Sequence, residues 1–327
     1  MQDHRSRASL LASLLLGSAL AAGTALADTV YVSDEGTDSV HVIDGATHAV
    51  TAKIAVGKRP RGLALSPDGK LLYVAVSNDN RIDIVDTASR KVVGQLPSGD
   101  DPETFAVSAD GKFLYASNEN DGQISFLDIA ARKVVAKVAV GKEPEGVAVS
   151  PDGKLVAATA EQTGKVYLID VAAQKVVAEP EVGARPRIVR FSADGKQLWA
   201  SSEGAAKVVV IDPASGKITA TTDLRDGWPE GTPVQGEAIQ ITRDGKRVFV
   251  ATGRGNKVAE IDPATMKVVR TFPVGQRVWH IALSPDESRL YAANGVSGDV
   301  TFIDLKKNEP IATLATGGKP WGVVVGP

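Results

Sequence analysis

The sequence repeats itself with a period of 42 residues, and this repeat constrains the fold more than any other feature. A turn motif of the type SPDGK recurs six times, and the successive intervals are 42, 42, 42, 50 and 42 residues. An apolar strand that ends in aspartate recurs seven times in the same register, at Asp44, Asp86, Asp128, Asp170, Asp212, Asp262 and Asp304. A fixed period of this length indicates a repeat architecture in which each copy folds as one supersecondary unit.

Each copy predicts four short strands, which read GLALS, LLYVAVS, RIDIVDT and KVVGQLP in the first complete copy. These segments are rich in β-branched and apolar residues and are bounded by Pro, Gly, Asp and Asn, as strands are. Many are apolar on both faces, which suits sheets that are covered on both sides. The sequence therefore predicts an all-β fold, a seven-bladed β-propeller of four-stranded antiparallel blades.

The two ends of the repeat region belong to one blade. The stretch VYVSD, from Val30, matches the second strand of a copy, whereas PWGVVVGP, from Pro320, matches the first strand. We therefore expect the C-terminal strand to join the N-terminal blade and close the ring, which leaves no open blade edge between the ends.

Residues 1–27 have the pattern of a secretory signal peptide. Arg5 and Arg7 precede an apolar run from Leu10, and the segment ends in Ala25-Leu26-Ala27, a small-x-small cleavage pattern. An uncleaved anchor is the alternative. We expect export to the periplasm, a single propeller domain over residues 28–327, and no membrane insertion after cleavage.

Composition excludes several classes of function. The chain has no cysteine, which removes disulfides, thiolate metal sites and cysteine catalysis. The formal net charge of −2 provides no basic surface, so we expect no nucleic-acid partner. We expect a monomer.

The motifs YVAVSN, YASNEN and YAANG each follow an SPDGK-like turn, and they make the chain resemble the YVTN-type β-propeller repeat family. The literal tetrapeptide is absent, and the nearest match is YVAV at Tyr73. More narrowly, the chain resembles the periplasmic β-propeller protein associated with PQQ-dependent alcohol catabolism and an ABC-type transport system. The resemblance implies a catabolic context, not a chemistry. In that context one hypothesis is a binding or scaffold protein whose partner is a small-molecule solute, a dehydrogenase or a transporter component.

The constant residues of the repeat have structural roles. In SPDGK, Pro presets a turn and Gly supplies a positive φ, which is β-turn chemistry between the first and second strands. The strand-ending aspartates precede turns, where a carboxylate accepts backbone N–H groups. A calcium role for these aspartates is the alternative, but seven identical turns favour the structural role.

The variable residues of the repeat gather at the other end of the propeller. In a four-stranded meander this end holds the turns between the second and third strands and the connections between blades. Five residues before each SPDGK-like turn lies a position that borders the central channel, and we call its seven occupants the mouth ring: Arg61, Glu103, Glu145, Arg187, Glu237, Trp279 and Trp321. Two residues before each of them lie Arg59, Asp101, Glu143, Arg185, Gln235, Arg277 and Lys319.

An insertion of eight residues falls on the same end. It expands one blade connection into DLRDGWPEGTPVQGE, residues 223–237, and it carries Trp228. Insertions into single repeats often mark the binding face. We therefore predict that the mouth ring, with Trp228 and with His280 beside Trp279, binds a ligand or a partner protein. The alternative is a set of compensating salt bridges around a solvated channel.

No catalytic motif accompanies this ring. The sequence has no G-x-S-x-G elbow and no H-E-x-x-H pair, and His280 is the one histidine near the ring, where a general base or a metal ligand could act. Carboxylate and amide oxygens at the ring are the ligand type that calcium prefers, so a divalent cation such as calcium is the cofactor that the pattern leaves open. The sequence favours a binding protein, and a metal-dependent hydrolase or lyase of the lactonase type is the alternative.

Overall fold

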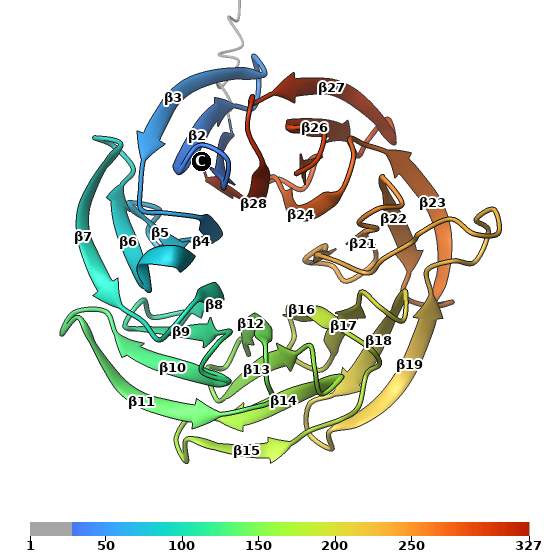
Figure 1. Ribbon diagram of the computed structural model, residues 1–327. Coiled ribbons are helices and arrows are strands. Elements are labelled where there is room, and N and C mark those ends of the chain that lie inside the picture. Colours follow the sequence, from blue (N-terminus) through green and yellow to red (C-terminus); the bar gives the residue numbers. More distant parts are fainter. Residues whose placement is uncertain (1–27, 327) are drawn as a thin grey trace, which may run out of the picture.

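The computed structural model describes residues 28–326, which form seven four-stranded antiparallel sheets around a central axis (Figure 1). Blade 1 contains β28 (Pro320–Gly326), β1 (Thr29–Asp34), β2 (Ser39–Asp44) and β3 (Ala49–Ala55). Blade 2 contains β4 (Pro60–Leu65), β5 (Leu71–Val76), β6 (Arg81–Asp86) and β7 (Lys91–Pro97), with a 3-10 turn at Ser77–Asp79. Blade 3 contains β8 (Pro102–Val107), β9 (Phe113–Asn118), β10 (Gln123–Asp128) and β11 (Lys133–Ala139). Blade 4 contains β12 (Pro144–Val149), β13 (Leu155–Ala160), β14 (Lys165–Asp170) and β15 (Lys175–Ala178).

The remaining three blades continue around the ring in chain order. Blade 5 contains β16 (Pro186–Phe191), β17 (Leu198–Ser202), β18 (Lys207–Asp212) and β19 (Lys217–Asp223). Blade 6 contains β20 (Ile239–Ile241), β21 (Val248–Ala251), β22 (Lys257–Asp262) and β23 (Lys267–Pro273). Blade 7 contains β24 (Val278–Leu283), β25 (Arg289–Asn294), β26 (Asp299–Asp304) and β27 (Glu309–Ala315). The predicted seven-bladed fold is confirmed, and the predicted signal peptide lies outside the described residues. Within residues 28–326, no helix has the length and apolar character that crossing a membrane requires.

The ring closes as predicted, because β28 is the innermost strand of blade 1. Val30 pairs with Val325 and Tyr31 with Val324, and the register shifts between Val32 and Asp34. The N-terminal and C-terminal strands are thereby held in one sheet. Closure removes the free strand edge that an open array of blades would present.

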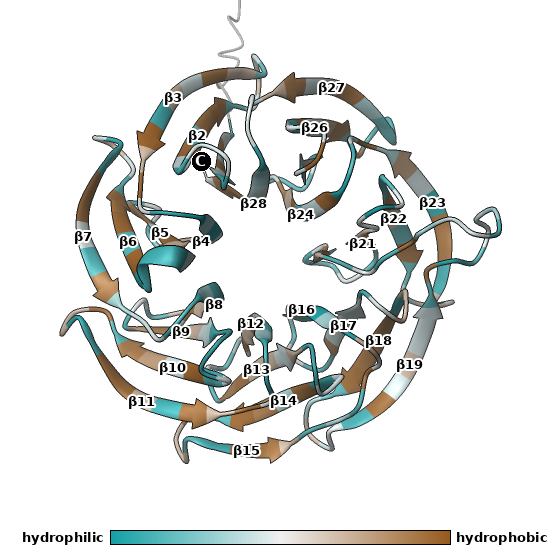
Figure 2. Ribbon diagram, viewed as in Figure 1, coloured by the Kyte–Doolittle hydropathy of each residue, from teal (hydrophilic) through white to brown (hydrophobic). Residues whose placement is uncertain are grey.

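Apolar side chains fill the spaces between neighbouring blades. One buried cluster joins Tyr31 and Val42 of blade 1 to Leu72 and Val74 of blade 2, and six further clusters fill the other parts of the ring. Figure 2 shows the apolar residues along the middle strands, whereas the outermost strands alternate between apolar and polar residues. This is the expected result for sheets covered on both faces except at their outer edge.

The constant residues of the repeat build turns. Ser66 donates to the Asp68 carboxylate over 2.6 Å, the Leu71 amide donates to the Ser66 hydroxyl, and Gly69 has a φ of +70°. Each of the seven strand-ending aspartates accepts backbone N–H groups from the turn that follows, as at Asp44 with Thr47. The structural role predicted for these residues is confirmed.

Hydrogen bonds between blades fix the innermost strands. Side-chain hydroxyls of one blade donate to backbone carbonyls of the next blade. The four pairs are Ser33 to Arg61, Ser117 to Glu145, Thr159 to Arg187 and Ser201 to Glu237. The backbones also approach closely here, since a Cβ on Gly146 would lie 2.3 Å from the Arg187 carbonyl oxygen. The mouth ring is therefore held by the backbone at positions that the scaffold dictates.

Candidate functional site

The mouth ring lies at the start of the innermost strands, and most of it is buried. Five of its members directly follow a proline that begins the strand, at Pro60, Pro102, Pro144, Pro186 and Pro320. Glu103, Glu145, Arg187, Glu237 and Trp321 are buried, whereas Arg61 and Trp279 are partly exposed. The charged side chains therefore form a largely buried network among the described residues, and not the solvated one of the alternative interpretation.

Arg187 is the centre of this network. Its guanidinium pairs with Glu145 over 2.7 Å, with Glu161, and with Glu237 over 3.3 Å. Three blades therefore share one buried cation, since Glu145 and Glu161 belong to blade 4 and Glu237 precedes the first strand of blade 6. Removing one partner from a buried ion pair leaves an uncompensated charge, which is costly.

The other arginines extend the network around the ring. Arg277 pairs with Glu203 over 3.1 Å and with Glu237 over 3.3 Å. On the opposite side, Arg61 pairs with Glu35 over 2.7 Å and with Glu103 over 3.1 Å. The structure therefore contains the compensating salt bridges of the alternative interpretation, in buried form. Binding at the ring itself stays a prediction.

The aromatic residues of the predicted site do not form one surface. The Trp321 ring packs between the Arg61 guanidinium, 4.7 Å from its centroid, and the His280 ring, whose centroid lies 4.1 Å away. The guanidinium of Arg277 lies 3.9 Å from the Trp279 centroid. Trp321 is 1 % exposed and belongs to the packed interior, so it offers little surface to a ligand.

Trp228 lies apart from the ring. Its side chain packs against the core cluster that contains Leu224 and Val234, and the Lys257 ammonium lies 4.4 Å from its centroid. The insertion is thus folded back onto blades 5 and 6. Among the predicted residues, Trp228 is the one that the structure does not bring near the others.

Carboxylates outnumber nearby cations on the side of blades 3 and 4. Burial raises the pKa of Glu103 well above its usual value, and the neighbouring Glu145 adds to this effect while Arg61 and Arg59 oppose it. Carboxylate oxygens of Asp101, Glu103 and Glu119 all lie within 4.8 Å of one another. This oxygen-only set matches the ligand type of calcium, so these three residues could hold the divalent cation that the sequence left open.

Burial also raises the pKa of Glu237, to about 7. The folded protein then holds the proton of the Glu237 carboxyl more tightly than the unfolded chain, in which the pKa of a glutamate is 4.5. Protonation of Glu237 therefore stabilises the folded protein. This contribution is complete below pH 4.5 and is lost as the pH rises through about 7.

We therefore expect Glu237→Gln to weaken the pH dependence of stability. Between pH 4.5 and about 7, the free energy of unfolding should fall by about 1–3 kcal/mol less in this variant than in the wild type. Urea unfolding across this pH range measures the effect. The exposed Glu230→Gln, in the same insertion, is the control and should leave the pH dependence unchanged. An unaltered slope in Glu237→Gln would show that this carboxyl does not take up the proton.

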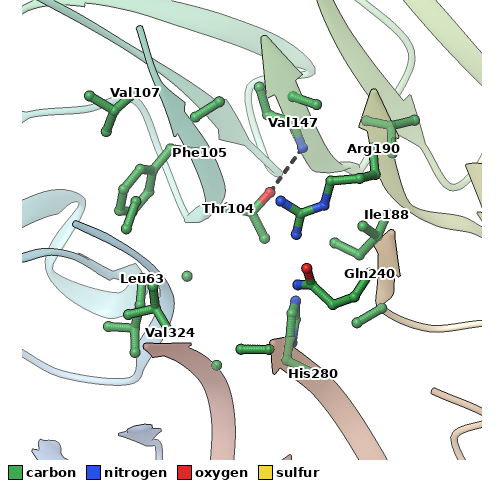
Figure 3. A pocket seen from close by; sticks show the side chains of 18 of the residues that line it. Leu63, Thr104, Phe105, Val107, Val147, Ile188, Arg190, Gln240, His280 and Val324 are labelled. Atoms are coloured by element: carbon green, nitrogen blue, oxygen red, sulfur yellow. Dashed lines mark hydrogen bonds between the residues drawn. The ribbon is translucent and has the colours of Figure 1, made fainter. Parts of the chain in front are cut away.

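A central cavity of about 600 Å³ lies beneath the mouth ring (Figure 3). Its lining starts one residue after the ring in six of the blades and two residues after it in blade 4, at Val147. It continues to the exposed turn residues Pro151 and Ala193 at the opposite end. No mouth-ring residue is among the lining residues within the described chain. The accessible cavity therefore faces the end that carries the constant turns, which the sequence did not indicate.

Polar groups are few on the cavity wall. Figure 3 shows Arg190, Gln240 and His280 pointing inward among apolar side chains such as Leu63 and Ile188. Gln240 donates its amide N–H to the Ile281 carbonyl over 2.8 Å, which fixes the orientation of the amide.

His280 is neutral in this setting. Burial is the largest cause that lowers its pKa to about 3, and the cations Arg187 and Arg61 contribute to the same effect. A neutral imidazole can donate or accept a hydrogen bond in the cavity. A group with so low a pKa is a weak general base, because catalytic bases work best when their pKa lies near the operating pH.

Sequence reasoning missed Arg190 and Gln240. Both occupy the position three residues after the mouth ring, where the other five blades carry Ala64, Ala106, Ala148, Ala282 and Val324. Alignment of the copies at this second position was the signal that could have found them.

Two models of known protein families match parts of the chain. The family described as "Lactonase, 7-bladed beta-propeller" matches residues 146–315, which are 170 of the 327 residues, and a YNCE-like β-propeller family matches residues 71–149. No curated protein matches the chain.

Solved structures share the fold. A Kuenenia stuttgartiensis hydrazine synthase chain has 25 % identity and a TM-score of 0.76 over 84 % of this chain and 92 % of its own. A functionally unknown protein from Desulfotomaculum acetoxidans has 15 % identity and a TM-score of 0.78 over 91 % and 98 %. The dihydro-heme d1 dehydrogenase NirN, in complex with DHE, has 18 % identity and a TM-score of 0.67 over 90 % and 74 %. With its seven blades and a family match over half of its length, the chain belongs to the seven-bladed β-propeller lactonase family.

Proposed function

We propose that the chain is an exported, periplasmic binding protein that holds a small organic solute in its central cavity. The observation that carries this proposal is the cavity itself, with about 600 Å³, apolar walls and a few inward-pointing polar groups. Such a composition is typical of small-molecule sites. The resemblance to propellers associated with PQQ-dependent alcohol catabolism suggests a solute or partner from that system, such as a dehydrogenase or a transporter component.

Blocking the cavity tests this proposal. We expect Ala106→Phe to place a phenyl ring into the lumen, because Ala106 lines it from blade 3. A thermal-shift screen of alcohols, aldehydes, carboxylates, lactones and PQQ should yield probes that raise the melting temperature of the wild type, since ligands that bind only the folded state stabilise it. These shifts should vanish in Ala106→Phe.

The control is Ala172→Phe, which adds the same side chain at an exposed turn of blade 4. It should keep every shift. Probe binding that survives in Ala106→Phe would place the site outside the cavity and contradict the proposal.

A second candidate is lactone hydrolysis assisted by a divalent metal. It is favoured by the family description and by the carboxylate set Asp101, Glu103 and Glu119. A bound metal would polarise the ester carbonyl and activate water.

This candidate predicts lactone hydrolysis that falls at least tenfold after chelation and in Glu103→Gln, and that returns when calcium is added back to the wild type. Hydrolysis can be followed by the acid released. Stoichiometric metal should also be found in the purified protein. If the calcium-loaded protein binds a lactone but does not hydrolyse it, lactone hydrolysis is contradicted and the binding function is supported.

A further inference from the structure

We infer that Arg190 and Gln240 form a carboxylate subsite in the central cavity, so that the bound solute is a monocarboxylate with an apolar body. This inference rests on the proposed binding function and names its ligand class.

Arg190 differs from the arginines of the mouth ring because it has no anionic partner. Arg187 and Arg277 each contact two or more carboxylates. Among residues 28–326, no hydrogen bond or ion pair reaches the Arg190 side chain, and desolvation alone lowers its pKa. The side chain is nevertheless exposed to the cavity and points into it (Figure 3). An arginine in this state has its full hydrogen-bonding capacity available to a ligand.

The scaffold does not require an arginine at this level. Five of the seven blades build the same strand position with Ala or Val, in the same backbone setting. An arginine at this level therefore adds a cation that has no anionic partner in the described chain. A charged residue that the repeat does not need, and that has no partner within the protein, is best explained by a ligand that pairs with it.

Gln240 lies next to Arg190, because blades 5 and 6 are neighbours, and it is the other polar exception at this level. Its amide is held by the bond to the Ile281 carbonyl, which leaves one amide N–H and the amide oxygen toward the lumen. His280 lies two residues nearer the ring in blade 7 and adds a neutral hydrogen-bonding group. A planar guanidinium recognises a carboxylate with two parallel hydrogen bonds, and the amide can orient that carboxylate.

The surroundings limit the ligand to one negative charge. Arg190 is the single cation among the residues that line the cavity in the described chain, and the remaining walls include Leu63, Phe105 and Val147. A dianion would leave a second charge unpaired against apolar side chains, which is costly. An apolar body attached to the carboxylate would instead bury its surface on these walls.

Calorimetric titration with benzoate, benzamide and benzyl alcohol tests the inference, because these probes share a ring and differ in charge. Wild-type protein should bind benzoate more tightly than either neutral probe. Arg190→Met should weaken benzoate binding about 10- to 100-fold, the usual effect of losing hydrogen bonds to a charged group, and should leave benzamide binding nearly unchanged. Arg190→Lys should retain part of the affinity, since lysine keeps the charge without the planar fork.

Two controls separate recognition from structure. Arg254→Met removes the same charge from an exposed position and should bind benzoate as the wild type does. Arg190→Met should keep or raise the melting temperature, because it removes an unpaired cation, whereas a structural arginine would lower it when replaced.

The outcomes are distinct. Equal binding of benzoate and benzamide to the wild type, or wild-type affinity for benzoate in Arg190→Met, would overturn the carboxylate subsite but leave the binding function standing. Failure of all three probes to bind the wild type would overturn the subsite, and the broader ligand screen with Ala106→Phe would then decide the binding function separately.

Discussion

A chain truncated after Gly318 should fail to fold cooperatively, because it lacks β28 and the ring stays open. β28 supplies the pairing partner of β1, and it inserts the buried Trp321 beside blades 7 and 2. Loss of one buried Trp side chain alone costs about 3–5 kcal/mol. The unpaired edge of β1 and the lost burial of three valines add to this, and the total approaches the net stability of an ordinary domain, about 5–15 kcal/mol.

Circular dichroism during urea titration measures this effect. The full chain should show a single cooperative transition, and the truncated chain should show none at ambient temperature. A chain that lacks only Pro327 is the control. Adding a peptide of residues 319–327 should restore part of the transition, since the peptide can re-form the pairing with β1. Cooperative unfolding in the truncated chain at wild-type urea concentrations would show that closure does not stabilise the propeller.

Replacing Arg187 with Met should lower the free energy of unfolding by about 3–5 kcal/mol, as expected when one partner of a buried ion pair is removed. The substitution leaves Glu145, Glu161 and Glu237 buried without their shared cation. Carboxylates in this position would take up protons instead. The loss should therefore be largest at high pH and smaller below pH 4.5, where the unfolded chain is also protonated.

Arg185→Met is the matched control, because Arg185 is exposed and pairs with Glu161 and Glu203, which also neighbour Arg187. We expect a loss of about 1 kcal/mol, because the exposed guanidinium is largely screened by water. Adding Glu237→Gln to Arg187→Met should recover part of the loss, since it removes one of the carboxylates that Arg187 had compensated. Equal effects of Arg187→Met and Arg185→Met would contradict the role of Arg187 as the centre of a buried network.

Trp321 belongs to the predicted site, but replacing it would not test binding alone. Its position in the repeat suggested an aromatic surface at the channel mouth. The structure packs it between Arg61 and His280 with 1 % exposure. A Trp321→Ala variant would lose binding and stability together, so Arg190 and Ala106 are better places to test function.

The sequence alone determined the scaffold. The 42-residue period, the turn motif and the seven strand-ending aspartates predicted blade number, strand count and ring closure, because each of these depends on contacts within one copy or between adjacent copies. The identity of the mouth ring was predicted for the same reason, since backbone hydrogen bonds such as Ser33 to Arg61 repeat with the copies.

Tertiary structure decided what the variable positions do. Whether Arg187 is solvated or buried depends on whether carboxylates from the neighbouring blades 4 and 6 reach it. The pattern within a single copy does not contain that information. The same holds for the cavity, which begins just below this network and carries Arg190 without an anionic partner. A repeat determines the backbone position of each side chain. Charge pairing and solvent access near the axis depend in addition on contacts between blades, which form only when all seven blades are assembled.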